Sequence, residues 1–112
     1  MKTLNKNIRN FAQKREWEQF HSPKNLAMAL SVEVAEIVEH FQWLTQAQSN
    51  NLDPVKLAQI EAEIGDVMIY LTRLADRLGI DPVKAAEEKM RLNEEKYPVE
   101  KAKGIAAKYT EL

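Results

Sequence analysis

The sequence has no cysteine, only three glycines and four prolines, and no long apolar run. Without cysteine the chain has no disulfide, no thiolate metal ligand and no cysteine nucleophile. Few residues interrupt helices or form hairpins, which favours an all-α fold. We find neither a membrane-spanning apolar stretch nor an apolar run of the signal-peptide kind near Met1. We therefore expect a cytoplasmic protein without a membrane partner.

The charges are nearly balanced, with 16 basic and 17 acidic residues and a formal net charge of −1. Such a chain has no bulk electrostatic attraction for nucleic acid, which we exclude as a partner. A length of 112 residues with 45% hydrophobic content fits one small globular domain.

Three segments combine a helix-capping side chain with a following proline, which suits the first helical position. They are Ser22-Pro23, Asp53-Pro54 and Asp81-Pro82. With the apolar periodicity they predict helices at residues 4–18, 22–44, 53–78 and 83–96. The third helix would end at Gly79, and residues 46–52 would be a polar loop. We expect a four-helix bundle over residues 1–98 and a C-terminal arm, helical or extended, over 99–112.

The predicted second helix carries acidic residues beside its apolar stripe. At 100° per residue the stripe consists of Leu26, Leu30, Val34, Ile37, Phe41 and Leu44. Glu33 falls on this stripe, and Glu36 falls on its flank with His40. Burying a carboxylate is costly unless something compensates its charge.

The third helix repeats this pattern with Glu63 and Asp66. Its stripe consists of Leu57, Ile60, Ile64, Val67, Met68, Leu71, Leu74, Ala75 and Leu78. If the two helices pack side by side, four carboxylates converge and repel one another. A hard divalent cation would remove that conflict, and oxygen ligands with open positions suit Mg²⁺.

Two other interpretations of the acidic pairs remain open at this point. Acidic residues are common on helix faces that are simply solvated. A di-iron carboxylate site would need two Glu-x-x-His units, and only Glu18 and His21 have that spacing.

Aromatic and basic residues suggest where a nucleotide would bind. Rings at Trp17, Trp43 and Tyr70 could stack on a base, although core or subunit packing is the commoner role of a tryptophan. His21 could be structural, and we read His40 as a surface or interface residue. Lys89, Asn93 and Lys96 share a helix face that could hold a polyphosphate or simply be solvated.

Five segments together resemble one known group of proteins. They are Trp17-Glu-Gln-Phe-His21, Glu33-Val-Ala-Glu36, Phe41-Gln-Trp43, Glu63-Ile-Gly-Asp66 and Lys89 to Pro98. They are similar to segments of the dCTP pyrophosphatases, a branch of the MazG-like all-α nucleoside triphosphate pyrophosphohydrolases. The resemblance spans nearly the whole chain. Ile8 departs from it, since the animal enzymes have a substrate-contacting histidine there.

The resemblance implies Mg²⁺-dependent hydrolysis of dCTP to dCMP and pyrophosphate, in a homotetramer built from dimers. It implies metal ligands at Glu33, Glu36, Glu63 and Asp66. Our own hypothesis is that Glu36 or Glu63 serves as the general base, and the sequence does not say which. The implied substrate contacts are Trp17, Glu18, Gln19, Phe20, His21, Trp43 and Tyr70. Phosphate contacts would come from Lys89, Asn93, Lys96 and Tyr97. The alternatives are a pyrophosphohydrolase for another nucleotide and a helical module that binds a nucleotide or a partner without hydrolysis.

Overall fold

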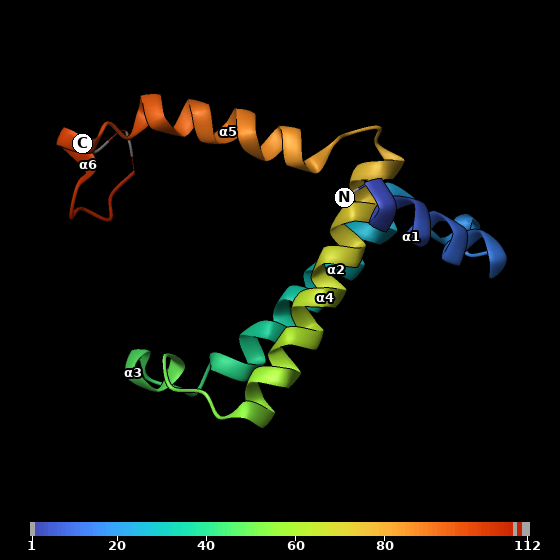
Figure 1. The fold of residues 1–112 in the computed structure, drawn as a ribbon, viewed down its shortest axis with the longest axis horizontal. Helices are drawn as coiled ribbons and strands as arrows, with labels where there is room; N and C mark the ends of the chain where they lie inside the picture. Colours follow the sequence, from blue (N-terminus) through green and yellow to red (C-terminus); the bar gives the residue numbers. More distant parts are fainter. Residues whose placement is uncertain (1, 109, 111–112) are drawn as a thin grey trace. The chain divides into compact units, whose positions relative to one another are not determined.

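The computed structural model describes residues 2–108 and 110, and this part of the chain contains helices and no strand (Figure 1). The elements are α1 (Lys2–Lys14), the 3₁₀ helix η1 (Glu18–Phe20), α2 (Pro23–Phe41), α3 (Gln46–Ser49), α4 (Pro54–Arg77), α5 (Pro82–Lys96) and α6 (Val99–Ala102). The expected all-α class is confirmed. None of the described helices is both long and apolar enough to cross a membrane.

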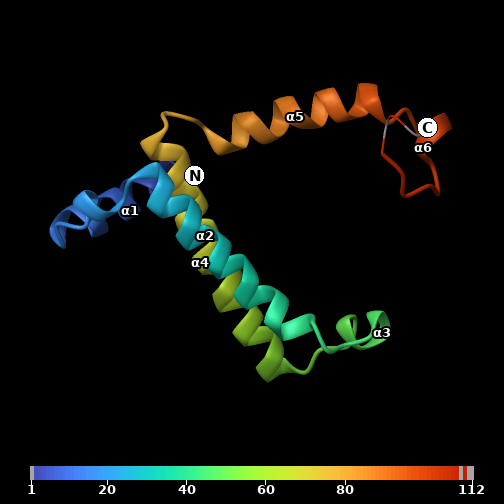
Figure 2. The same cartoon turned by 180° about the vertical axis from the view of Figure 1, so that it is seen from behind.

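The chain forms two compact units, residues 1–80 and residues 81–112. In the first unit α2 and α4 lie side by side, as Figures 1 and 2 both show, and α1 packs against α4. The second unit contains α5 and α6. The division that we predicted at residue 98 stays a prediction.

The three capping signals are confirmed by hydrogen bonds. The Ser22 hydroxyl accepts from the Asn25 amide at 3.1 Å, which starts α2. The Asp53 carboxylate accepts from the Lys56 amide at 2.8 Å and starts α4, and Asp81 caps α5 in the same way. These caps fix the first residue of each long helix, and thereby the faces on which the later residues fall.

Helix ends differ more from the prediction. The first helix stops at Lys14 rather than at residue 18, because the chain turns at Glu16, where φ is +55°. The expected polar loop contains α3, which Thr45 and Gln48 start with a reciprocal capping box. Gly79 follows the end of α4 with φ of +68°, as predicted for a glycine that ends a helix.

The predicted apolar stripes are only partly buried. The buried apolar residues in the described part of the chain are Ala12, Leu26, Ile60 and Ala75. Other stripe residues are exposed, among them Val34 at 45%, Leu57 at 55% and Ile64 at 56%. One chain therefore leaves part of both stripes exposed. The first unit has too few helices to cover every side of the α2–α4 pair.

A polar network joins α1 to the last turns of α4. The Asp76 carboxylate accepts from Asn5 Nδ2 at 3.2 Å and from Arg9 Nε at 2.8 Å, and it pairs with Arg73 Nη1 at 3.4 Å. The hydrogen bonds from Arg9 are the main cause that lowers the pKa of Asp76, and Asn5 adds to them against the effect of burial. Arg73 is 4% exposed, so Asp76 is the charge that compensates a buried guanidinium.

We expect Asp76→Asn to lower the free energy of unfolding by roughly 2–4 kcal/mol, because it leaves the buried Arg73 without its counter-charge. Asp76 has a lowered pKa, so its stabilisation is present above the ordinary value of 3.8 and is lost as the pH falls through the lowered value. The difference in the free energy of unfolding between wild type and variant should therefore shrink in acid. Urea unfolding at pH 7 and at pH 3 measures both effects.

The matched control is Glu88→Gln, which removes an ion pair with Arg91 whose two side chains are exposed. It should change the free energy of unfolding by less than about 0.5 kcal/mol. Equal effects of the two substitutions would contradict a special role for the Asp76 network.

Candidate active site

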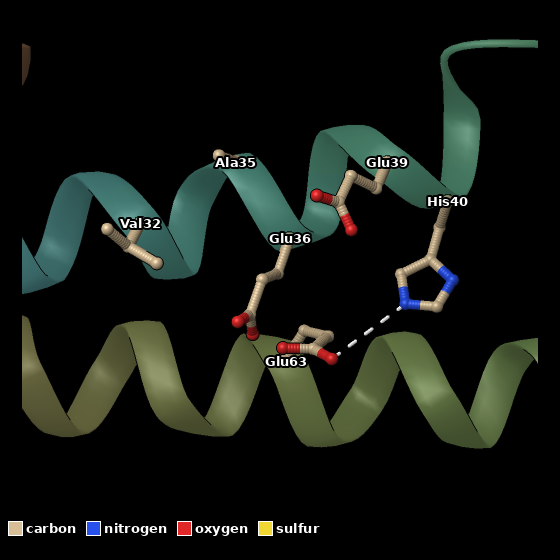
Figure 3. A pocket seen from close by; sticks show the side chains of 6 residues that line it. All are labelled: Val32, Ala35, Glu36, Glu39, His40 and Glu63. Carbon is tan, nitrogen blue, oxygen red and sulfur yellow. Dashed lines mark ion pairs between the residues drawn. The ribbon is translucent and has the colours of Figure 1, made fainter.

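Four carboxylates converge between α2 and α4. Glu33 and Glu36 come from α2, Glu63 and Asp66 come from α4, and one oxygen of each lies within 4.8 Å of the others. Figure 3 shows Glu36 and Glu63 pointing toward each other from the facing helices. This convergence is what the two i, i+3 spacings predict when the helices lie side by side.

The electrostatics of this acidic cluster are unfavourable as it stands. Burial is the first cause that raises the pKa of Glu33, followed by the hydrogen bond and charge of Glu36. The hydrogen bond with Glu36 is the first cause that raises the pKa of Glu63, followed by burial, and His40 opposes these effects. The Oε2 atoms of Glu33 and Glu63 are buried without a hydrogen-bond partner. The carboxyls of Glu33 and Glu63 are therefore held where they resist losing a proton.

A divalent cation fits these observations. All four donor groups are carboxylates, which hard cations prefer, and a cation would give the two unpartnered oxygens a partner. It would also replace the repulsion among the carboxylates by attraction. The acidic cluster could therefore hold a divalent metal ion.

An open hollow lies over one side of the acidic cluster (Figure 3). It has a volume of about 600 Å³ and is lined by Val32, Ala35, Glu36, Glu39, His40 and Glu63. His40 Nε2 lies 3.9 Å from Glu63 Oε1, and His40 Nδ1 lies 3.3 Å from Lys56 Nζ. His40 thus faces the acidic cluster, a contact that the prediction of a surface or interface histidine does not include.

A second, mainly apolar cavity lies between α1 and α4. Its volume is about 220 Å³, and its lining residues are Ile8, Phe11, Ala12, Trp17, His21, Asp66, Ile69, Tyr70 and Arg73. The Trp17 ring lies 5.6 Å from Phe11 and 6.2 Å from His21, centre to centre and edge to face. Three predicted substrate residues, Trp17, His21 and Tyr70, therefore come together here.

Other predicted substrate residues lie elsewhere. Glu18, Gln19 and Phe20 form η1 and are exposed, outside the lining of this cavity. Trp43 is 86% exposed just after the end of α2. Because Trp17 precedes the 19-residue α2 and Trp43 follows it, the helix separates them by roughly 28 Å. One chain alone does not place both indoles in one pocket.

The predicted phosphate contacts fall in the second unit. Lys89, Asn93 and Lys96 lie on α5, and Tyr97 is its C-terminal capping residue. Their role stays a prediction.

Sequence reasoning missed Arg73, the buried arginine that lines the aromatic cavity. A signal for it existed. Asp66, Tyr70 and Arg73 follow one another at spacings of four and three, which places them on one face of α4. Arg73 also stands among leucines and alanines, where a charged residue needs a partner.

Comparison with known proteins now decides the family. The model of the MazG-like family matches residues 28–112, which include both acidic pairs. The chain belongs to the MazG-like family. The matched region contains all of α4 and α5 and most of α2.

Relatives and a solved structure agree with this. The MazG-like chain is 44% identical to dCTP pyrophosphatase 1 of Rattus norvegicus and 43% identical to that of Homo sapiens, each over 104 residues. These matches cover 91% of this chain but 61% of each relative, so the chain spans about three fifths of their length. A pyrophosphatase from Archaeoglobus fulgidus has a similar structure, with a TM-score of 0.83, 41% identity and coverage of 88% and 92% of the two chains.

We expect Glu36→Gln to stabilise the metal-free protein at pH 7.5, with a Tm higher by roughly 2–5 °C. The raised pKa values of Glu33 and Glu63 mean that folding gains relative stability below their ordinary value of 4.5 and loses it as the pH rises through the raised values. Removing the Glu36 charge relieves part of that loss. The gain in Tm should shrink near pH 4, where the raised pKa values keep Glu33 and Glu63 protonated.

Thermal unfolding with and without 5 mM MgCl₂ extends this test. A cation that binds the folded state should raise the Tm of the wild type and should raise that of Glu36→Gln less. Glu61→Gln, an exposed acidic residue on α4 outside the acidic cluster, is the control and should respond like wild type. A metal-free Glu36→Gln that is less stable than wild type at pH 7.5 would contradict the account of charge repulsion.

Proposed function

We propose that this chain hydrolyses dCTP, and related pyrimidine deoxynucleoside triphosphates, to the monophosphate and pyrophosphate with Mg²⁺ as cofactor. One observation carries the proposal. Asp66 belongs to the acidic cluster and also lines the aromatic cavity. A triphosphate held at the acidic cluster would therefore have a base or sugar within reach of that cavity. The relatives named dCTP pyrophosphatase 1 support the choice of dCTP.

The acidic cluster provides the residues for this chemistry. Glu33, Glu36, Glu63 and Asp66 would hold Mg²⁺, which prefers such oxygen ligands. A bound Mg²⁺ supplies charge neutralisation for the phosphates and lowers the pKa of a coordinated water. Glu36 or Glu63 would take the proton from the attacking water. A water oxygen then forms a bond to phosphorus, and the P–O bond of the α,β bridge breaks to release pyrophosphate.

Other residues would hold the rest of the nucleotide. Trp17, His21 and Tyr70 line the cavity that we assign to the base and sugar. Lys89, Asn93, Lys96 and Tyr97 are proposed to contact the phosphates. Removal of dCTP or its modified forms in this way would sanitise the nucleotide pool of the cytoplasm.

We also propose a homotetramer built from dimers. Apolar side chains on α2 and α4 remain exposed in one chain, including Val34, Leu57 and Ile64. A large apolar surface of this kind favours association with further copies. Trp17 and Trp43 stand at opposite ends of α2, so a base pocket with both indoles needs Trp43 from a second subunit.

Pyrophosphate release from a panel of dCTP, dUTP, dTTP and dATP with Mg²⁺ tests the activity. We expect the highest kcat/KM for dCTP and a loss of at least about 100-fold in Glu36→Gln, because an electrostatic group at the reacting centre is removed. Glu61→Gln should keep the wild-type rate. A higher kcat/KM for another nucleotide would still support a nucleoside triphosphate pyrophosphatase but would contradict dCTP as its preferred substrate. If the wild type released pyrophosphate from none of them, the chain would be a binding module.

We expect light scattering after size-exclusion chromatography to give the mass of a tetramer for the wild type. Leu57→Lys should reduce the assembled fraction by tenfold or more at micromolar concentration, because it places a charge on an exposed apolar face. Gln59→Lys, on an exposed polar position two residues further along α4, should assemble normally. A monomeric wild type would refute this assembly.

A further inference from the structure

Arg73 is a buried cation that the proposed chemistry leaves without a role. It is 4% exposed and lines the aromatic cavity together with His21, Tyr70 and Asp66. Burying a guanidinium is costly unless its charge and its N–H donors find partners. Its contacts therefore indicate what it does there.

Two of its three nitrogens have partners in the first unit. Arg73 Nη1 donates to Asp76 Oδ2 at 3.4 Å, and Arg73 Nε donates to His21 Nδ1 at 3.3 Å. Nη2 is buried without a hydrogen-bond partner among the described residues. This third donor belongs to a residue that lines a cavity, where a ligand atom or an ordered water would satisfy it.

The contact with Nε determines where the proton of His21 lies. A guanidinium has donors and no acceptor, so the His21 Nδ1 that it contacts must accept. A neutral imidazole with an accepting Nδ1 carries its proton on Nε2. Burial, and then the charges of Arg73 and Arg77, lower the pKa of His21 against a smaller effect of Glu18, which keeps the ring neutral at pH 7.5.

We propose that Arg73 is a positioning residue that fixes His21 as the Nε2–H tautomer, so that His21 offers a hydrogen-bond donor to an acceptor atom on the base of a pyrimidine nucleotide. The proposal rests on the proposed function, because it assumes that the base enters this cavity. O2 and N3 of cytosine are such acceptors. Inorganic tripolyphosphate has no base, so its binding should not depend on Arg73.

The first test reads the tautomer directly and needs no activity. Long-range ¹H–¹⁵N spectra of the wild type at pH 7.5 should show His21 with a bare Nδ1 and a protonated Nε2. The chain has two histidines, and the signals that disappear in His21→Gln assign the ring. In Arg73→Met the spectrum should move toward a mixture of tautomers. A wild-type His21 that is protonated on Nδ1 overturns the proposal whatever the enzyme activity is.

The second test separates recognition of the base from general structural damage. Calorimetric titration uses α,β-methylene-dCTP, in which the α,β bridge cannot be hydrolysed, and inorganic tripolyphosphate, both with Mg²⁺. Arg73→Met should raise the Kd of the nucleotide roughly tenfold, the loss of about one hydrogen bond, and should leave the Kd of tripolyphosphate within twofold. Equal weakening of both ligands would show a merely structural role and overturn the proposal.

Arg77→Met is the matched control. It removes a positive charge one turn further along α4 that also lowers the pKa of His21, while the Nε contact of Arg73 remains. It should bind both ligands like wild type. If Arg73→Met does not fold, Arg73→Lys replaces it, because lysine keeps the buried charge but lacks the planar fork of the guanidinium. Arg73→Lys should likewise raise the Kd of the nucleotide and leave that of tripolyphosphate unchanged. Failure of the proposed function would appear separately, as a wild type that releases no pyrophosphate while its His21 spectrum stays as expected.

Discussion

Repulsion among four carboxylates between α2 and α4 is the constraint on which the rest of the structure depends. Two helices that carry Glu33, Glu36, Glu63 and Asp66 within 4.8 Å of one another must be held together by something else. The buried parts of their stripes, such as Leu26 and Ile60, provide apolar burial that favours the pair. Metal-free folding therefore balances burial against charge, and a bound cation would turn the same charges into attraction.

The polar network at the last turns of α4 also contains charges that need compensation. Asp76 gathers Asn5 and Arg9 from α1 and Arg73 from α4, so a buried cation is compensated within the chain. Among the described residues, His40 is the one basic side chain that pairs with the acidic cluster, and it lies 3.9 Å from Glu63. The charges of the first cluster are compensated within the chain, and those of the second are not. This contrast is why we assign stability to the first and ligand binding to the second.

Much of this was predictable because local signals determine where helices start. The caps at Ser22, Asp53 and Asp81 fix each helix by hydrogen bonds within four residues, and periodicity then places the carboxylates on facing sides. Features that depend on distant packing were not predictable. The pairing of Arg73 with His21 spans 52 positions, and the exposure of Leu57 depends on how many helices one chain supplies.

The length of α2 links these features to the assembly. A helix of 19 residues separates the aromatic segment before it from Trp43 after it, yet both acidic residues lie in its middle. A single chain therefore places Trp17 at the cavity beside Asp66 and does not place Trp43 there. Two antiparallel copies of the pair would bring each Trp43 toward the aromatic cavity of the other, and they would cover exposed apolar residues in the same step. Base recognition and burial of the apolar face would then have a single structural cause.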